Sequence, residues 1–264
     1  MARIPYFVVD AFANQLFRGN PAGVCPLEKW LDDALMQNLA AENNLSETAF
    51  FVPRGSDYEL RWFTPTVEID LCGHATLASA FILFSQLNHR GDSVRFHSKS
   101  GPLTVSRSGE VLTLDFPSRP PESCATPKGL IDGLGKQPIE VLKARDYFAI
   151  FEKAEDVRSL QPDFRLLGKL DDKVIVTAPG RDCDFVSRFF APTAGVNEDP
   201  VTGSAHCTLI PYWAKRLRKT KLFARQLSKR GGEIFCEDIG DRVRIGGNAM
   251  LYSRGEIELT DVKL

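Results

Sequence analysis

The chain has 264 residues, with 33 Lys and Arg against 34 Asp and Glu, and 43% of the residues are hydrophobic. This balanced charge, without a basic stripe, excludes nucleic acid and an anionic membrane surface as the main partner. No apolar run approaches the roughly 18 residues of a membrane span, and the opening MARIPYFVVDAF does not resemble a signal peptide. The six scattered cysteines therefore predict reduced thiols and a cytoplasmic location.

The first half of the chain predicts short strands and two helices. Strands are expected over 6–12, 48–52, 58–64, 93–98, 101–107 and 110–116, and the turn-forming residues over 18–23 predict a loop. A helix is expected over 32–44, where Asp32 and Asp33 supply the start signal and Asn43 and Asn44 the stop signal. A second helix over 73–87 is apolar on almost every side, so it must be buried on nearly all sides.

The proline-rich stretch 117–127 is the clearest linker and predicts a domain boundary. Beyond it we expect strands over 138–144, 147–151, 173–180 and 184–192, with a helix near 154–161. A loop then leads into a helix within 198–217 that Pro211 should kink. Strands are expected again over 222–228, 231–237, 242–247, 249–253 and 256–260.

A weak internal repeat relates the two halves. CGHATLAS and TGSAHCTL share a glycine, polar residues, an alanine and a following leucine, and their glycines are Gly73 and Gly203. The repeat predicts two similar modules, each a curved antiparallel sheet wrapped around an apolar helix. The helix N-termini could then hold a small carboxylate in the cleft between the domains, because free N–H groups attract anions. The alternative is that the glycines only shape tight turns.

Four polar residues beside these helix starts are candidates for the chemistry. Glu47 precedes an apolar strand, where it is either a surface turn residue or a group for proton transfer. His74 and Asp199 lie next to the two helix starts, although a histidine is often packed and an Asp-Pro pair often begins a turn. Ser204 alone would be an ordinary capping residue. A structural zinc site is not expected, because no His and Cys have finger-like spacing.

Four motifs in order, FRGNPAGV, LSETAF, RWFTPTVEIDLCGHATLASA and FAPTAGVNEDPVTGSAH, show that the sequence resembles the PhzF-like, or phenazine biosynthesis-like, family. The resemblance implies an α+β fold of the diaminopimelate-epimerase type, with two pseudo-symmetric domains around an active site. The expected domains are 1–117, completed by the C-terminal strand at about 250–264, and 118–249. The stretch from about 121 to 181 is shorter than is usual in such proteins.

The resemblance also implies a cofactor-independent isomerase that moves a proton at carbon on a small carboxylic acid. It implies no metal, no nucleic-acid or membrane partner, and allows a homodimer. The family's catalytic positions fall on Glu47, His74 and Asp199, with Glu47 as the acid/base. Substrate-binding positions fall on Asn20, Gly73, Gly203 and Ser204.

Cys72 raises the question of a thiol mechanism. Related epimerases and racemases use two cysteines, one at each helix start, but Pro200 takes the position of the second thiol in this sequence. A two-thiol mechanism is therefore not expected. Two alternatives to the isomerase stay open: a ligand-binding or interaction protein on the same scaffold with little catalysis, and a one-thiol racemase that uses Cys72.

Overall fold

A computed structural model describes residues 2–259 and divides the chain into two compact units. Unit 1 comprises Met1–Asp115 with Gly246–Leu264, and unit 2 comprises Phe116–Ile245. The sequence placed the domain boundaries after residues 117 and 249, and in the structure the units divide after residues 115 and 245. Among the described residues, none of the helices is long and apolar enough to cross a membrane.

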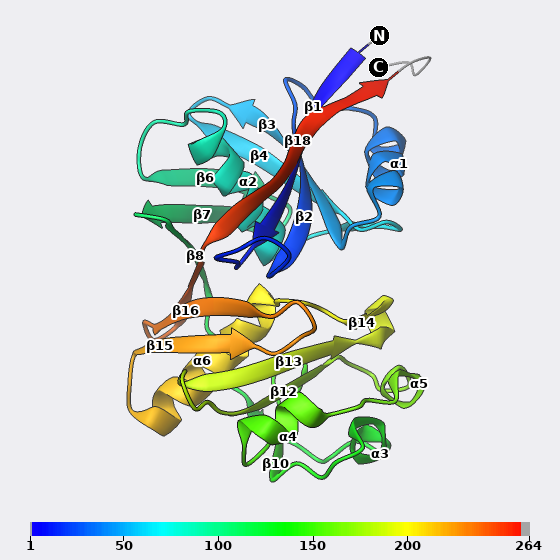
Figure 1. The fold of residues 1–264 in the computed structure, drawn as a ribbon, viewed down its shortest axis with the longest axis vertical. Helices are drawn as coiled ribbons and strands as arrows, with labels where there is room; N and C mark the ends of the chain where they lie inside the picture. The colour runs from blue at the N-terminus through cyan, green and yellow to red at the C-terminus, as the bar shows by residue number, and fades with distance from the viewer. Residues whose placement is uncertain (1, 260–264) are drawn as a thin grey trace. The chain divides into compact units, whose positions relative to one another are not determined.

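The sheet of unit 1 winds around one helix (Figure 1). Its main strands are paired in the order β18-β1-β2-β3-β4-β6-β7-β8, and β5 is added beside β4. The strands are β1 (Ala2–Ala11), β2 (Asn20–Pro26), β3 (Glu47–Arg54), β4 (Asp57–Phe63), β5 (Glu68–Ile69), β6 (Ser93–Ser98), β7 (Gly101–Ser108), β8 (Val111–Pro117) and β18 (Ala249–Leu259). The pairs β2–β3 and β4–β6 are parallel and the other pairs are antiparallel.

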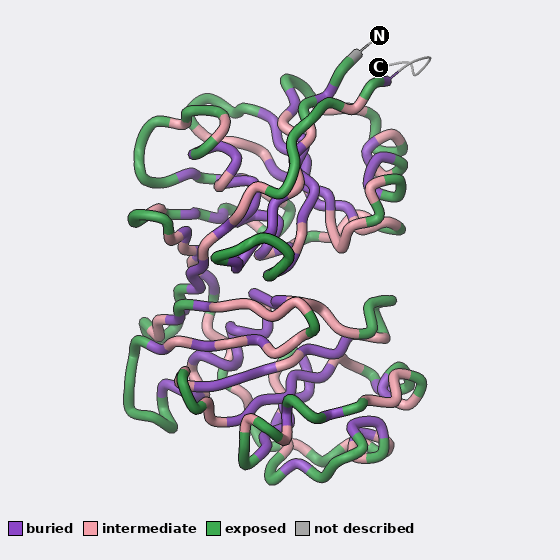
Figure 2. Tube along the Cα trace, in the orientation of Figure 1, coloured by how far each residue is buried: buried purple, intermediate pink, exposed green. Residues whose placement is uncertain are grey.

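Helices lie on both faces of this sheet. The central helix α2 (Gly73–Ser85) packs against β1, β2, β3 and β7, and ten of its 13 residues are buried. This confirms the expectation from its apolar sequence. Helix α1 (Asp33–Asn43) packs on β3 and β4, and the Asp32 side chain accepts a hydrogen bond from the Ala34 N–H at its start. In Figure 2, α1 alternates between buried and exposed along its turns, as a helix with one face on a sheet must.

Unit 2 repeats this arrangement. Its strands are β9 (Glu122–Ser123), β10 (Glu140–Lys143), β11 (Tyr147–Ile150), β12 (Val174–Pro179), β13 (Phe185–Ala191), β14 (Val196–Glu198), β15 (Lys221–Gln226), β16 (Gly232–Asp238) and β17 (Arg242–Gly247). The order β10-β11-β12-β13-β15-β16 alternates antiparallel and parallel pairs in the same sequence as β1-β2-β3-β4-β6-β7. The internal repeat seen in the two glycine motifs therefore extends to the strand topology.

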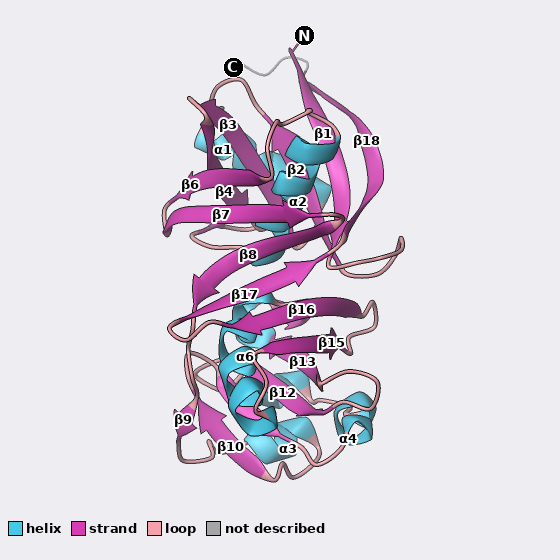
Figure 3. Cartoon of the chain, turned by 90° about the vertical axis from the view of Figure 1, so that its left-hand side faces the viewer, coloured by secondary structure: helices cyan, strands magenta, loops and turns pink. Residues whose placement is uncertain are grey.

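The central helix of unit 2 is α6 (Gly203–Leu217), which packs against β15 and β16 (Figure 3). It continues through Pro211 without ending. The other face of the sheet carries shorter helices, α3 (Leu130–Leu134), α4 (Ala154–Ser159) and α5 (Phe164–Leu167), and a 3-10 turn, η1 (Pro192–Ala194), follows β13.

The structure corrects three expectations from the sequence. The sheets are mixed rather than purely antiparallel, because the connections through helices return the chain parallel to the strand that it left. The expected loop 18–23 is mostly strand, since β2 begins at Asn20, which pairs with Ala11. The two strands expected over 249–253 and 256–260 are one strand up to Leu259, because pairing with β1 runs past Gly255; residue 260 lies outside the described residues.

Candidate active site

In unit 1 the chain brings together two of the predicted catalytic side chains. Glu47 is the first residue of β3 and His74 is the second residue of α2. His74 Nε2 lies 3.1 Å from Glu47 Oε2, and the two side chains are 6% and 16% exposed. The Oε2 atom itself is buried, so the exposure of Glu47 belongs to the rest of its side chain. A carboxylate held by a buried imidazole, with part of the side chain still accessible, can exchange a proton with a ligand.

The other ring nitrogen of His74 faces Asn20 and Cys72. Asn20 Nδ2 lies 3.2 Å from His74 Nδ1, and Cys72 Sγ lies 3.5 Å from the same atom. These two contacts turn the ring so that Nε2 faces Glu47. Asn20 is completely buried at the start of β2, which fixes its amide against the ring.

Burial and charge act in opposite directions on these groups. Burial alone disfavours the imidazolium form of His74, but Cys72 and Glu47 outweigh this and raise the pKa of His74 well above its ordinary value. Burial, reinforced by the Glu47 charge, raises the pKa of Cys72 to about 11. At neutral pH Cys72 is therefore a thiol rather than a thiolate.

Glu47, Cys72 and His74 also have the donor atoms of a metal site. Their ligand atoms all lie within 4.8 Å of one another. The spacing argument against a structural zinc site considered only His and Cys, and it could not foresee that the fold adds a carboxylate from β3. These three residues are the ones that could hold a metal ion in this part of the chain.

In unit 2, Asp199 lies in the loop before α6 and is tied to that helix start. Thr202 Oγ1 donates a hydrogen bond of 2.5 Å to Asp199 Oδ2. The buried Gln226 of β15 accepts from the Thr202 N–H at 2.9 Å and donates to the Asp199 carbonyl at 2.8 Å. Gln226 thus holds the 199–202 segment, a role that the sequence prediction missed. Its signal was a polar residue at the inward position of a strand whose other inward residues are Leu222 and Ala224.

Ser204 is the second residue of α6, the position that His74 has in α2. Its hydroxyl oxygen accepts a 3.0 Å hydrogen bond from Arg145 Nη2. The sequence prediction missed Arg145 as well, because 59 residues separate the pair and no motif marks the arginine. Gly73 and Gly203 each begin a helix, and neither has the positive φ that would make glycine necessary.

Aligning the helices on their first residues changes the counterpart of Cys72. The residue before α2 is Cys72 and the residue before α6 is Thr202, so Thr202 rather than Pro200 occupies the matching position. Threonine lacks a thiol, as proline does, and the argument against a two-thiol mechanism is unchanged. In the described chain neither Cys72 nor Thr202 caps its helix through a side-chain hydrogen bond.

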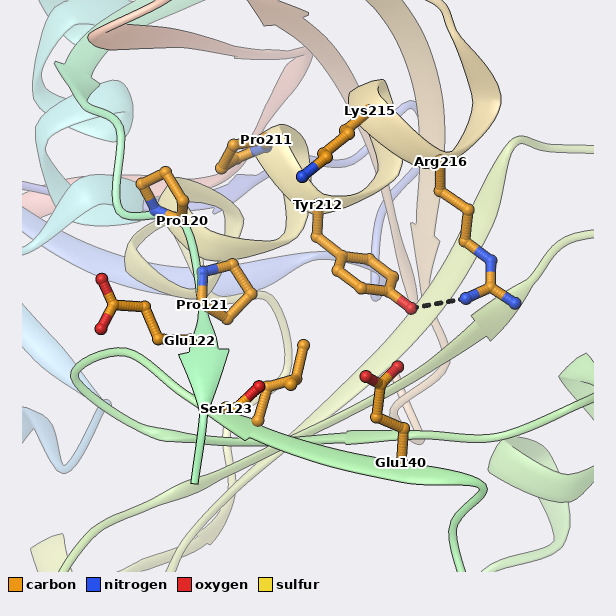
Figure 4. A pocket seen from close by; sticks show the side chains of 10 residues that line it. Pro120, Pro121, Glu122, Ser123, Glu140, Pro211, Tyr212, Lys215 and Arg216 are labelled. Atoms are coloured by element: carbon orange, nitrogen blue, oxygen red, sulfur yellow. Dashed lines mark hydrogen bonds between the residues drawn. The ribbon is translucent and has the colours of Figure 1, made fainter. Parts of the chain in front are cut away.

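A separate cavity of about 660 Å³ lies in unit 2, between the second half of α6 and the strands β9 and β10 (Figure 4). The ring of Tyr212 forms part of the cavity wall, and Arg216 Nη1 donates a 2.8 Å hydrogen bond to the Tyr212 hydroxyl. Glu122, Glu140 and Lys215 add charges of both signs. The residues predicted as catalytic or substrate-binding do not line this cavity.

Two topologically equivalent units, each a mixed sheet rolled around a helix with polar groups at its start, define the class of proteins with the epimerase-like fold. Within this class the chain belongs to the PhzC-PhzF family, because the family model for phenazine biosynthesis-like protein matches residues 9–255. The resemblance noted in the motifs is confirmed, and the chain is an isomerase of this family.

Relatives match along nearly the whole chain. It is 54% identical over 254 residues to "Uncharacterized isomerase PA2770" of Pseudomonas aeruginosa, covering 96% of this chain and 98% of that protein. It is 38% identical to mouse "Phenazine biosynthesis-like domain-containing protein 1", covering 97% and 99%. A PhzF-family crystal structure from Enterococcus faecalis has a TM-score of 0.96 at 52% identity, covering 98% and 100%. A hydroxyproline epimerase from Agrobacterium vitis, with a TM-score of 0.64 at 12% identity, shares the fold.

Proposed function

We propose that this isomerase transfers a proton at a carbon atom of a small carboxylic acid, with Glu47 as the acid/base and without a cofactor. The observation that carries the proposal is the 3.1 Å contact between buried His74 Nε2 and Glu47 Oε2 at the start of α2. It couples a carboxylate that a ligand can reach to an imidazole that can share its proton.

The side chains of unit 1 supply the groups that the proposed proton transfer needs. Glu47 takes the proton from one substrate carbon and, as the carboxylic acid so formed, returns a proton to a carbon of the same substrate, while His74 Nε2–H keeps its contact with Glu47 Oε2. Asn20 contacts Nδ1 of the ring, so the orientation of His74 is retained during the transfer. The N–H groups at the start of α2 would stabilise the negative charge that develops on the substrate as its carbon loses the proton. Asp199 and Ser204 belong to unit 2, and their part in the reaction stays a prediction.

Small carboxylic acids are the substrate class that the family resemblance supports. The dihydro-hydroxyanthranilate of the phenazine isomerase is one such acid, and the Agrobacterium vitis fold neighbour was solved with bound trans-4-hydroxy-L-proline. A test panel should therefore contain cyclic amino acids, 2-hydroxy acids and unsaturated acids, each with an acidic C–H next to the carboxylate.

The test is deuterium incorporation from D₂O into the members of this panel, followed by NMR. Glu47→Gln keeps the size of the side chain and removes its basicity, so incorporation should fall by about 10²–10⁴-fold. Glu42→Gln, on the exposed face of α1, is the matched control and should keep the wild-type rate. If Glu47→Gln exchanges an acid as fast as the wild-type protein does, the proposed role of Glu47 is wrong.

The same assay separates the alternatives. Tight binding of an acid without any deuterium incorporation would favour a ligand-binding protein on this scaffold. Because Glu47, Cys72 and His74 could also bind a metal ion, the exchange should be repeated after chelation and after addition of Zn²⁺. Exchange that is lost on chelation and restored by the metal would overturn the cofactor-independent mechanism.

A further inference from the structure

Three residues of unit 2 form a hydrogen-bonded cluster that the proposed mechanism does not use. Arg145 donates to Asp146 Oδ2 through Nε at 3.1 Å and Nη2 at 2.8 Å, and Nη2 also donates to Ser204 Oγ at 3.0 Å. Asp146 is 4% exposed, whereas the Arg145 side chain is 40% exposed. The buried carboxylate therefore anchors an arginine whose outer part is open to a ligand.

The hydrogen bonds leave a defined set of donors unused. Nε and both N–H groups of Nη2 are directed at Asp146 and Ser204, so within residues 2–259 the two N–H groups of Nη1 make no hydrogen bond. Since Ser204 Oγ accepts from Arg145, the hydroxyl proton of Ser204 must point elsewhere and can be donated. Two N–H groups and one O–H group suit the two oxygen atoms of a carboxylate.

The repeat gives this cluster a counterpart in unit 1. His74 and Ser204 are the second residues of α2 and α6, and each is contacted from the start of an equivalent strand. Asn20 at the start of β2 contacts His74, and Arg145, two residues before β11, contacts Ser204. In unit 1 this contact holds the ring of His74 in place. In unit 2 the equivalent contact sets the direction of the Ser204 hydroxyl.

We propose that Arg145, anchored by Asp146, is a positioning and specificity-determining residue that makes unit 2 select a carboxylate over a neutral amide. It would hold the Ser204 hydroxyl as a donor and offer Nη1 to the same carboxylate. The inference rests on the proposed function only in assigning that carboxylate to the substrate of the isomerase.

The test measures binding of 2-aminobenzoate and of its neutral analogue 2-aminobenzamide by isothermal titration calorimetry. The wild-type protein should prefer the acid by at least about tenfold, the value of one charge-assisted hydrogen bond. Arg145→Met should weaken binding of the acid about tenfold and change binding of the amide less than about twofold. Arg145→Lys keeps the charge but not the planar guanidinium, so its affinity for the acid should lie between those of the wild-type protein and Arg145→Met.

A double-mutant cycle checks that Arg145 acts through Ser204. In a Ser204→Ala background, Arg145→Met should cost less affinity for the acid than it does in the wild-type protein. Arg165→Met is the matched control, because Arg165 also pairs with a nearby aspartate, Asp163, but is 90% exposed. This control should bind both compounds as the wild-type protein does.

Two results would overturn the assignment. One is a wild-type protein that binds acid and amide equally or binds neither, and the other is an Arg145→Met variant that loses both in parallel, as a structural role would produce. The result is independent of turnover. Loss of Glu47-dependent exchange with an intact preference for the acid would reject the proposed reaction and keep the role of Arg145.

Discussion

In unit 1 the central helix begins with Gly73 and His74, and in unit 2 it begins with Gly203 and Ser204. Around His74 the fold gathers groups that can lose or gain a proton, Glu47 and Cys72. Around Ser204 and its helix start it gathers amide, hydroxyl and guanidinium groups that donate hydrogen bonds. In our proposals one scaffold thus serves proton transfer in one copy and carboxylate recognition in the other.

The two units also share a structural ion pair. Arg61 of β4 binds Glu68 of β5 through two hydrogen bonds, and Arg188 of β13 binds Glu198 of β14 in the same way. These arginines begin the hexapeptides RWFTPT and RFFAPT, which are a clearer sequence signal of the repeat than the glycine motifs. Each arginine also lies over a phenylalanine two residues later. The repeat therefore preserves the support of the loop before each central helix.

Register shows where the units diverge. Arg61 lies opposite Phe50 and Arg188 opposite Val176, so the positions three residues earlier, Glu47 and Lys173, correspond. Unit 2 has a cation where unit 1 has its candidate base. Unit 2 therefore lacks a carboxylate at the strand position of Glu47, which supports the division of roles between the units.

The largest effect on folding is expected from the support pair of unit 2. Arg188→Ala leaves Glu198 without its partner and removes donors to the Val157 and Leu160 carbonyls, so it should lower the free energy of unfolding by about 3 kcal/mol. Arg61→Ala should cost less, because Lys99 still pairs with Glu68 at 2.6 Å. Urea unfolding of both variants tests this order. An Arg61→Ala variant that is as destabilised as Arg188→Ala would show that the pairs are equivalent.

A second effect distinguishes the histidines of the two central helices by pH. Burial lowers the pKa of His206 to about 4, although the Thr202 carbonyl that accepts from its Nδ1 partly opposes this shift. The unfolded chain binds a proton near the ordinary pKa of 6.5, so stability from neutral His206 is present above that pH and is lost as the pH falls toward 4. At pH 5 the loss should be about 2 kcal/mol. A His206→Leu variant should lack this slope in urea unfolding.

His74 should give the opposite slope. Its pKa is raised in the folded protein, so its contribution is complete below the unfolded value of 6.5 and is lost as the pH rises through the folded pKa. His74→Gln should flatten the alkaline limb of the stability profile while leaving the acid limb unchanged. If His206→Leu and His74→Gln changed the same limb of the stability profile, the opposite roles of the two histidines would be wrong.

The sequence was informative where motifs encode local structure and less so where tertiary contacts decide. The glycines, Glu47, His74 and the buried α2 were predictable because each is marked by a motif or by its apolar neighbours. Arg145 was not, since its partner Ser204 is 59 residues away. The turn formers near Asn20 suggested a loop, but pairing with β1 overrides that local preference. Helices of four or five residues, such as α5 and α3, are too short to show a periodic pattern.

A smaller effect on stability is expected from a change at Gln226, a residue that the sequence analysis did not single out. Gln226→Leu keeps the approximate size but leaves the Thr202 N–H and the Asp199 carbonyl without this partner, which should cost about 1.5 kcal/mol in unfolding free energy. Hydrogen exchange at the Thr202 amide should be faster in Gln226→Leu than in the wild-type protein. Unchanged exchange at Thr202 would show that the segment before α6 is held by other contacts.

The smallest effect on turnover is expected from Cys72, which tests whether unit 1 needs its thiol. With its pKa raised to about 11 by burial, Cys72 is protonated at neutral pH and cannot serve as the base. Cys72→Ala should therefore retain deuterium exchange to within about twofold, whereas Cys72→Ala combined with Glu47→Gln should be no slower than Glu47→Gln alone. Thr202→Ala, the change at the matching position of unit 2, is the control for disturbing a helix start. A Cys72→Ala variant that loses exchange while Thr202→Ala keeps it would establish the one-thiol racemase and assign the acid and base of unit 1 to Cys72 and Glu47 together.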